Sequence, residues 1–259
     1  MSRPTVLVET KEWVRTLTLN RPEARNAFNS QQYRELFDAL GEAESDDSVR
    51  VVVLTGAPGA FTAGQDLGEM SAPPEGRGDH PFSACIDRVI AFEKPLLAAV
   101  NGVGVGLGLT ILLHCDIVYI AEGARLRVPF VSLGVVPEAA SSYLLPARVG
   151  QQNAAEIFFT ADWVSSARAV EVGLAARELP PEVLMPAIRA LAARIVVHPP
   201  GAMRHTKRLL QMSRREAVRS ARAREDEAFR ERVGTPENVE AIRAFFEKRK
   251  PDFSNLDPT

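Results

Sequence analysis

The stretch VNGVGVGLGLTILLHCD, Val100–Asp116, changes character halfway along. An apolar strand-like run, Pro95–Val100, leads into alternate glycines, and an apolar helical run, Leu109–Cys115, follows them. Backbone N–H groups at the start of a helix attract negative charge, and glycine lets a ligand approach the backbone closely. The stretch therefore predicts either the electrophilic half of an active site or a tightly packed turn between a strand and a helix.

Strands and helices alternate on both sides of the glycine-rich stretch. Short apolar or β-branched runs predict a hairpin of strands at Thr5–Glu9 and Val14–Leu19, and further strands at Val51–Thr55 and Ile117–Ala121. An amphipathic helix is expected from Ser30, which is a good N-cap residue. This alternation predicts an α/β fold with mainly parallel strands, in which ligands bind at the carboxyl ends of the strands.

The carboxyl-terminal part of the chain is mostly helical in pattern. Thr235 is expected to cap the last helix, with Pro236 in its first turn. We expect residues 1–195 to form an α/β core and residues 196–259 a helical region, with a surface loop rich in proline and glycine at 71–81. Apolar spacing predicts helices at 141–149, 154–159, 165–172, 183–195, 201–211, 214–233 and 236–250.

The composition of the 259 residues, 46% hydrophobic and 25% charged, is ordinary for a soluble globular protein. The formal net charge of −2 provides no long-range attraction for nucleic acid or an anionic membrane. No segment has the ~20 apolar residues of a membrane span, and the amino terminus lacks a signal-peptide pattern. The two cysteines, Cys85 and Cys115, form no CxxC motif. We therefore expect a cytoplasmic protein without nucleic-acid or membrane partners.

Several cofactor and metal motifs are absent from the sequence. The glycine run has Leu107 and Leu109 where a dinucleotide fingerprint needs its third glycine, and no glycine loop is followed by a P-loop lysine. There is no GxSxG elbow and no HExxH motif, and the four histidines lack the spacing of metal ligands. His114 lies in an apolar helical run, which favours a hydrogen-bonded core histidine. The sequence predicts neither a nucleotide cofactor nor a metal.

A second glycine-marked turn follows the predicted strand Val51–Thr55. In the segment AFTAGQDL, Ala60–Leu67, Gln65 is placed to present its N–H group at the start of a short helix, with Asp66 near the cap. Two such turns are able to direct two N–H groups at one oxygen. That arrangement stabilises an oxyanion, and losing one donor costs roughly 10²–10³ in rate.

The two turns and their flanking segments carry a resemblance to a known family. The matching pieces are LNRPEARNAF (Leu19–Phe28), FTAGQDL (Phe61–Leu67), KPLLAAVNGVGVGLGLTILLHCDI (Lys94–Ile117) and LGVVPEAASSYLLPARVG (Leu133–Gly150). They resemble the enoyl-CoA hydratase/isomerase, or crotonase, superfamily over most of residues 14–179, and a weaker match ends the chain. Each motif alone is weak, but together they are highly specific.

This resemblance implies a spiral of repeated β-β-α units with a helical carboxyl-terminal region that forms trimers, or hexamers made of two trimers. It implies an acyl-CoA thioester as substrate, with its oxygen between the N–H groups of Gln65 and Leu107. Coenzyme A enters as part of the substrate, so no separate cofactor is expected. The residues implied to contact substrate are Arg25, Ala63, Gly64, Asp66, Leu67, Gly106, Phe130 and Val135. Arg25 suits a phosphate, with an exposed loop arginine as the alternative. Phe130 and Val135 are equally consistent with ordinary core.

The positions that differ from the family pattern bear on the reaction. Hydratases of this family resemble one another in two glutamates that activate water, where this sequence has Thr110 and Phe130. Glu138, in the segment PEAASS, is instead similar to the glutamate of peroxisomal-type Δ3,Δ2-enoyl-CoA isomerases. An unperturbed glutamate is a weak base, so we expect Glu138 to be partly desolvated. The alternative for Glu138 is a carboxylate that favours the dipole of the helix predicted at Ser141–Val149.

The resemblance therefore favours conversion of a 3-enoyl-CoA to a trans-2-enoyl-CoA through a dienolate, with Glu138 as both base and acid. One carboxylate suffices, because it removes a proton from C2 and returns it to C4. One alternative is another reaction of the superfamily, such as hydration, dehalogenation or thioester hydrolysis. A second alternative is a noncatalytic acyl-CoA-binding subunit that keeps the fold.

Overall fold

The structure is a computed structural model that describes residues 3–70, 81–254 and 256. In these parts of the chain a six-stranded sheet has the strand order β1-β2-β3-β4-β6-β9. The first pair is antiparallel and every other neighbouring pair is parallel, which confirms the predicted α/β fold with mainly parallel strands. The strands are β1 (Val6–Lys11), β2 (Val14–Leu19), β3 (Val51–Gly56), β4 (Leu96–Val100), β6 (Ile117–Ala121) and β9 (Arg177–Leu179).

A smaller three-stranded sheet has the order β5-β7-β8. Its strands are β5 (Gly104–Val105), β7 (Arg125–Arg127) and β8 (Val164–Ser165). Strand β5 follows β4 closely along the chain, so the glycine-rich stretch connects the two sheets. Val100, at the end of β4, and Leu126, in the middle of β7, are both fully buried. The connecting residues 101–103 are partly exposed, between two strands whose side chains reach the core.

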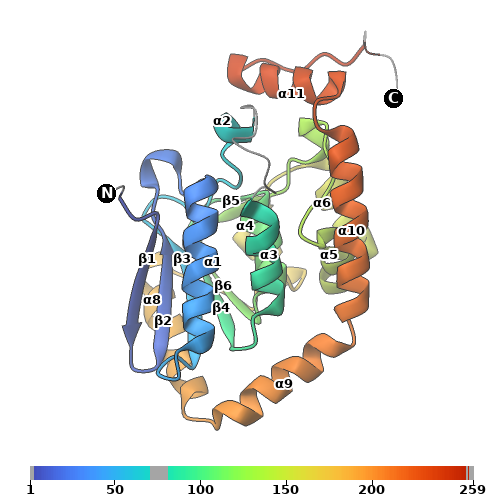
Figure 1. Cartoon of the computed structure of the whole chain (residues 1–259). Coiled ribbons are helices and arrows are strands. Elements are labelled where there is room, and N and C mark those ends of the chain that lie inside the picture. Colours follow the sequence, from blue (N-terminus) through green and yellow to red (C-terminus); the bar gives the residue numbers. More distant parts are fainter. Residues whose placement is uncertain (1–2, 71–80, 255, 257–259) are drawn as a thin grey trace.

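Helices cover both faces of the large sheet (Figure 1). Helices α1 (Ser30–Ser45) and α3 (Pro81–Ala91) pack against each other in front of the sheet, and α8 (Pro181–Val196) contacts β2, β3, β4 and β6 from behind. Strands β3 and β4 are buried along their whole length. Burial on both faces explains why these strands read as continuous apolar runs rather than as alternating ones.

The beginning of α1 corrects one prediction. Its N-cap is Asn29, whose Oδ1 accepts the N–H of Gln32 at 2.9 Å. Ser30 instead donates its N–H and its hydroxyl to the carboxylate of Glu69, at 2.7 and 2.9 Å. The expected cap is therefore wrong by one residue, because Ser30 already has a partner in the short helix α2 (Leu67–Met70).

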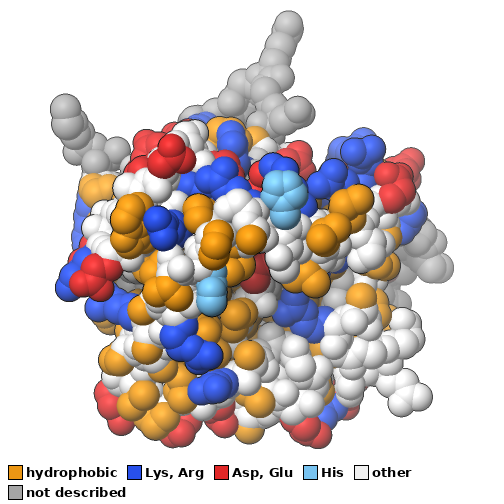
Figure 2. All heavy atoms as spheres, turned by 90° about the horizontal axis from the view of Figure 1, so that it is seen from below, with side chains coloured by type: hydrophobic (Ala, Val, Ile, Leu, Met, Phe, Trp, Pro, Cys, Tyr) orange, Lys and Arg blue, Asp and Glu red, His pale blue; other side chains and the backbone are white. Residues whose placement is uncertain are grey.

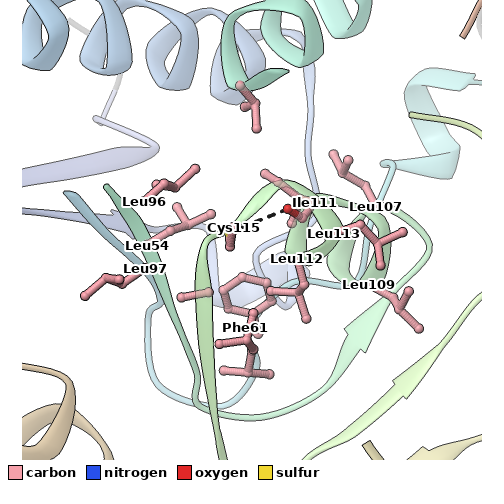
Figure 3. Packing of buried hydrophobic residues seen from close by; sticks show 14 of the residues in the cluster. Leu54, Phe61, Leu96, Leu97, Leu107, Leu109, Ile111, Leu112, Leu113 and Cys115 are labelled. Atoms are coloured by element: carbon pink, nitrogen blue, oxygen red, sulfur yellow. Dashed lines mark hydrogen bonds between the residues drawn. The ribbon is translucent and has the colours of Figure 1, made fainter. Parts of the chain in front are cut away.

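The helix expected at Leu109–Cys115 is also different in the structure. It is a single α-turn, α4 (Leu107–Thr110), followed by a 3-10 helix, η2 (Ile111–His114). A 3-10 turn is common at the end of an α-helix, and β6 begins three residues after His114. Figure 3 shows the apolar side chains of this segment beside Phe61 and the leucines of β3 and β4, with the Cys115 Sγ directed at the Ile111 carbonyl. The segment is thus both core and turn.

The carboxyl-terminal helices lie where the sequence predicts them, to within about one helical turn. They are α5 (Ser141–Val149), α6 (Gln151–Thr160), α7 (Ser166–Glu171), α9 (Pro200–Met212), α10 (Arg215–Arg232) and α11 (Pro236–Glu247). The Thr235 hydroxyl accepts the N–H of Asn238 at 3.4 Å, which confirms the predicted cap of α11. The loop predicted at 71–81 falls almost wholly outside the described residues, and Pro81 itself begins α3.

The last three helices wrap around the α/β core (Figure 1). Helix α9 runs below the core, α10 rises beside α5, and α11 crosses above and contacts the 3-10 helix η3 (Val131–Leu133). Helix α9 is anchored by Lys207, whose buried ammonium group donates to the Lys94 carbonyl at 2.7 Å and to the Asp116 carboxylate at 2.8 Å. These two hydrogen bonds attach α9, the first of the three wrapping helices, to the segments that precede β4 and β6.

Helix length, metal-ligand grouping and surface charge are known for the part of the chain that the structure describes. None of its helices combines the length and the apolar character that a membrane crossing requires. No group of three or more His, Cys, Asp or Glu side chains in these residues is placed to hold a metal ion. Figure 2, which views the molecule from below, shows basic, acidic and hydrophobic side chains intermixed on that face.

Candidate active site

The two predicted glycine turns pack directly against each other. The N–H groups of Phe61 and Thr62 donate to the Val103 carbonyl, and the N–H of Val105 donates back to the Thr62 carbonyl, each at 3.0 Å. Gly64 lies at this contact with a φ of +84°, and a methyl group on it would lie 2.4 Å from the Val105 oxygen. Only glycine fits there, because both the backbone conformation and the available space exclude a side chain.

The first turn is held from its other side by the loop that follows β2. The Thr62 hydroxyl donates to the Asn26 carbonyl at 2.6 Å and accepts the N–H of Gly64 at 3.0 Å. The N–H of Ala63 donates to the carbonyl of Arg25 at 2.9 Å. Asn26 and Thr62 are completely buried. The turn is therefore rigid, and its next N–H group, that of Gln65, has a fixed direction.

Two backbone N–H groups at this contact lack an acceptor within the described residues. They belong to Gln65, in the first turn, and to Leu107, which begins α4. A methyl group on Gly64 would lie 3.6 Å from the Leu107 nitrogen, so the two turns bring these groups into one neighbourhood. A methyl group on Gly106 would meet no atom within 4 Å, so the space beside it is open. An oxyanion bound there has two donors and room to approach them.

Tyr33 of α1 supports the first turn and connects it to the neighbouring helix. Its buried hydroxyl donates to the side-chain oxygen of Gln65 at 2.6 Å. Its ring packs against Phe28, 4.8 Å between centroids, and edge-on against Phe82 of α3 at 5.8 Å. Burial, followed by the charge of Glu138, raises the pKa of Tyr33 well above its ordinary value. The hydroxyl therefore stays protonated and remains a donor to Gln65.

Glu138 lies on the other side of α4, between η3 and α5. The Thr110 hydroxyl donates to its carboxylate at 3.3 Å, and Thr110 itself is fully buried. Burial raises the pKa of Glu138 to about 7, although the Thr110 hydrogen bond and the positive charge of Arg222 oppose this shift. A carboxylate with a pKa near 7 is a much stronger base than an exposed glutamate.

The segment after Glu138 is a tight turn with an unusual backbone. Ala139 and Ala140 both have left-handed φ values, 57° and 59°, and the N–H of Ser141 closes the turn on the Glu138 carbonyl at 3.0 Å. A left-handed conformation costs a residue other than glycine about 1–2 kcal/mol. Such strain persists only where surrounding contacts impose it, and it is common at active sites.

The hydrogen-bonding positions at the start of α5 are not filled by Glu138. They are taken by Glu225 of α10, which accepts the N–H of Ala140 at 2.6 Å and the N–H of Ser142 at 2.8 Å. The Glu138 side chain accepts instead from Thr110. Its carboxylate is therefore free of a capping role at α5.

Arg25 and Asp66, both predicted to contact coenzyme A, differ in their surroundings. Arg25 is exposed beside the Gln65 turn and carries no ion pair within the described residues, which suits contact with a phosphate. The Asp66 carboxylate accepts the Gly68 N–H at 3.1 Å and pairs with Arg21 at 3.0 Å. Its side chain thus caps α2 and ties the turn to the loop after β2, while Leu67 begins that helix.

Phe130 and Val135, predicted to line the acyl pocket, belong to the hydrophobic core. Each is 6% exposed, and the Phe130 ring lies 6.4 Å from the ring of Phe158 in α6. The N–H of Val135 donates to the Phe130 carbonyl at 3.0 Å. The packing toward α6 favours the core interpretation of Phe130, which the sequence left open.

His114 and Arg222 connect the neighbourhood of Glu138 with the carboxyl-terminal helices. His114 is buried and bonds through Nε2 to the Ala139 carbonyl at 2.8 Å. Burial lowers its pKa to about 4, so it is a neutral, hydrogen-bonded core histidine as predicted. His114 and Arg222 also line a cavity of about 570 Å³ between α3 and α10. Helix α10 is therefore a neighbour of the candidate site.

The sequence did not indicate the supporting residues Tyr33, Asn26 and Glu225. Tyr33 lies in the apolar stripe of α1, and the one available signal was that a buried tyrosine needs a partner for its hydroxyl. Glu225 lies in a charge-dense helix whose pattern indicated a solvated face. Its buried position depends on packing against α5, which local spacing does not encode.

Comparisons with known proteins agree with this geometry. A family model described as enoyl-CoA hydratase/isomerase matches residues 9–256. The short-chain-enoyl-CoA hydratase of Clostridium acetobutylicum is 36% identical, covering 95% of this chain and 95% of the relative. The 1,2-epoxyphenylacetyl-CoA isomerase of Escherichia coli is 30% identical, covering 96% and 98%. The crystal structure of an enoyl-CoA hydratase/isomerase from Pseudoalteromonas atlantica has a TM-score of 0.93 at 38% identity, covering 96% of this chain and 100% of that one.

Proposed function

Because this chain belongs to the enoyl-CoA hydratase/isomerase family, with a family match over residues 9–256, we propose that it converts a 3-enoyl-CoA to a trans-2-enoyl-CoA. Enzymes of this superfamily act on acyl-CoA thioesters, and a thioester suits a site with two convergent N–H groups. The proposal concerns which reaction follows enolate formation. That choice depends on the acid and base groups, which this chain carries in an unusual combination.

The observation that carries the proposal is the single desolvated carboxylate of Glu138. Its partner is Thr110, which stands where hydratases of the family have their first glutamate, and Phe130 of the core stands at the second. A threonine and a phenylalanine supply no base for water. One carboxylate with a pKa of about 7 is sufficient to move a proton between two carbons of a bound dienolate.

The reaction is balanced within the substrate and one side chain. Ionised Glu138 removes a proton from C2, and the electron pair of that C–H bond delocalises toward the thioester oxygen to give a dienolate. The N–H groups of Gln65 and Leu107 donate to the oxygen as its charge develops. Protonated Glu138 then returns the proton to C4. The double bond moves from C3–C4 to C2–C3, and the carboxylate is regenerated.

The remaining predicted residues have supporting roles in this proposal. Arg25 contacts a phosphate of coenzyme A, and the Ala63–Leu67 turn borders the thioester. Gly64 allows the two turns to pack together, and Gly106 leaves open space for close approach of the thioester. We further expect a trimer, or a pair of trimers, in solution. Helix α11 presents large exposed apolar side chains, including Phe245 and Phe246, that suit burial against another copy.

Hydration is the second candidate function, because most of the curated relatives are named hydratases. It requires a base for water that this chain does not place at the hydratase positions. The relatives therefore support the family and the ligand class, whereas the residues at the site favour isomerisation.

Product analysis with the wild-type protein tests the proposal. The protein is incubated separately with 3-hexenoyl-CoA and with crotonyl-CoA. We expect the absorbance of a conjugated enoyl thioester to grow with the first substrate and little 3-hydroxybutyryl-CoA to form from the second. Efficient hydration of crotonyl-CoA without isomerisation would overturn the proposal. Binding of both esters without turnover would support a noncatalytic acyl-CoA-binding protein.

A further inference from the structure

The turn that carries Glu138 is held from two sides by residues outside the proposed catalytic set. Ala139 and Ala140 are both fully buried and both left-handed, a conformation that alanine disfavours. Two consecutive left-handed residues make a turn for which glycine or asparagine is usual. The direction of the Glu138 side chain follows from this turn, because Glu138 is the residue at which it begins.

The first clamp comes from the carboxyl-terminal helix α10. The two carboxylate oxygens of Glu225 accept different N–H groups, Oε2 from Ala140 and Oε1 from Ser142. Glu225 is 5% exposed, so this bidentate contact is made inside the protein. Burial raises the pKa of Glu225, and the hydrogen bonds from Ser142 and Ala140 oppose that shift. The positive charge of Arg222, one turn earlier on α10 and paired with Asp226 at 2.7 Å, opposes it as well.

The second clamp comes from the end of η2. The Ala139 carbonyl accepts a hydrogen bond from Nε2 of His114. Because a carbonyl has no proton to donate, Nε2 of His114 must carry the proton. Both clamps act on the turn itself. His114 binds the Ala139 carbonyl and Glu225 binds the Ala140 N–H, so the peptide group that joins the two alanines has little freedom to rotate.

We propose that Glu225 and His114 are positioning residues that impose the left-handed Ala139–Ala140 turn and thereby direct the Glu138 carboxylate at the substrate. The inference rests on the proposed function, because it assumes that Glu138 is the group that moves the proton. It gives the carboxyl-terminal helix α10 a part in catalysis, through a contact between residues 85 positions apart in the sequence.

The test begins with Glu225→Gln. The amide oxygen of glutamine accepts a hydrogen bond from only one of the N–H groups of Ala140 and Ser142. The amide NH₂ group is a donor and repels the other N–H group. We expect kcat for 3-hexenoyl-CoA to fall roughly 10- to 100-fold with little change in KM, because a displacement of about 1 Å is enough for such a loss. Glu227→Gln, on the exposed side of the same helix, is the matched control.

Two further comparisons separate positioning from general stability. Glycine adopts the left-handed conformation without strain, so in an Ala140→Gly background the Glu225→Gln change should cost less kcat than in the wild type. His114→Gln retains an amide N–H near the position of Nε2, whereas His114→Met has none. The glutamine variant should therefore retain more kcat than the methionine variant.

The acid limb of the pH profile provides a third readout. The charged groups that act on Glu138 are Arg222, Glu225 and Asp226 of α10, and the charge of Glu138 in turn raises the pKa of Tyr33 of α1. The negative charge of Glu225 raises the pKa of Glu138, so its removal should move the limb to lower pH. A change confined to stability would lower the folded fraction and leave this limb in place.

Each result decides for or against the inference. Unchanged kcat in folded Glu225→Gln protein, or equal losses in the wild-type and Ala140→Gly backgrounds, would overturn it. If Glu225→Gln does not fold, a His114→Met variant with wild-type kcat would overturn it equally. Glu138→Gln is measured in parallel. If that variant keeps full activity, the proposed function fails, whereas loss of activity in Glu138→Gln with none in Glu225→Gln removes only the positioning role.

Discussion

Glu138 is a half-buried carboxyl group whose pKa is raised to about 7, chiefly because burial penalises its charged form. A base must be deprotonated to accept a proton from C2. The fraction of active enzyme should therefore rise with pH until the carboxyl is fully ionised. The same pKa makes the protonated form available to return the proton, which suits a residue that acts as base and acid in turn.

The pH dependence of kcat/KM tests this assignment at the level of one residue. We expect kcat/KM for 3-hexenoyl-CoA to increase about tenfold per pH unit below pH 7 and to become constant above it. Measurement between pH 5.5 and 8.5 in buffers of constant ionic strength checks this, with protein stability followed at each pH. An acid limb near pH 4.5, the ordinary value for glutamate, would contradict a desolvated Glu138.

The same group should make a measurable contribution to stability. Its pKa in the folded protein, about 7, is above its unfolded value near 4.5, so the folded state binds its proton more tightly. The contribution of Glu138 to the free energy of unfolding is therefore fully present below pH 4.5 and is lost as the pH rises through 7. Glu138→Gln stays neutral and avoids this loss, which amounts to at most about 3 kcal/mol.

Urea unfolding of the wild type and Glu138→Gln at pH 5 and pH 8 measures this effect without any substrate. We expect the variant to gain stability relative to the wild type on going from pH 5 to pH 8. The acid sensitivity that His114 contributes is common to both proteins and cancels in the comparison. A difference in free energy of unfolding that is independent of pH would show that Glu138 is not desolvated.

At the scale of elements, the glycine turns determine where the oxyanion donors lie. Gly64→Ala should distort the contact between the two turns, because the added methyl would lie 2.4 Å from the Val105 oxygen and φ is +84°. We expect kcat to fall by roughly 10²–10³, as for the loss of an oxyanion donor. Steady-state kinetics on the folded variant provides the measurement.

Gly123→Ala is the matched control for this prediction. Gly123 also has a positive φ, +76°, but a methyl group there would meet no atom within 4 Å. It carries the same backbone strain without the contact, in the exposed turn between β6 and β7. Equal losses of kcat in the two variants would contradict a specific role for the packed turn.

The elements that sequence predicts well are those with their own local signals. Helix α11 begins at Pro236 after the N-cap Thr235, and both residues predict a helix start. Asn29 and Ser30 are both good N-cap residues, so the local sequence does not distinguish between them. The hydrogen bond from Ser30 to Glu69 leaves Asn29 as the cap. Apolar periodicity does not report the division of residues 107–114 into an α-turn and a 3-10 turn, because every residue of both turns is buried.

At the scale of the whole molecule, the α/β core and the wrapping helices are joined by an ion pair between the buried Lys207 and the partly exposed Asp116. Lys207→Met removes the ammonium group that α9 places against Asp116 and leaves that carboxylate with the N–H of Leu96 as its remaining partner, at 2.7 Å. We expect the free energy of unfolding to fall by about 2 kcal/mol, more than for an exposed pair, because the Lys207 ammonium group is buried and loses charge-assisted hydrogen bonds. Urea unfolding followed by circular dichroism gives this value.

Arg243→Met provides the comparison on the surface. Arg243 pairs with Glu247 at 3.3 Å, and both side chains are largely exposed. Loss of this pair should change the free energy of unfolding by no more than about 1 kcal/mol. Similar values for the two variants would mean that Lys207 does not anchor the carboxyl-terminal helices.

The candidate site combines predictable and unpredictable parts for a physical reason. The backbone N–H groups of Gln65 and Leu107 lie next to glycine patterns that are visible in the sequence. The contacts from Tyr33 to Gln65 and from Glu225 to Ala140 join residues 32 and 85 positions apart. Such pairs follow from how helices pack on the core, so a single sequence shows neither the partner nor the burial that perturbs Glu138.

Turnover of 3-hexenoyl-CoA by Glu138→Gln, compared with the wild type and an exposed Glu122→Gln control, tests the central claim most directly. We predict that Glu138→Gln loses roughly 10²–10⁴ in kcat, because the amide neither removes nor returns a proton. Binding of a CoA ester, measured by calorimetry, should remain, since the N–H donors and Arg25 are unchanged. Wild-type turnover in folded Glu138→Gln protein would contradict the assignment.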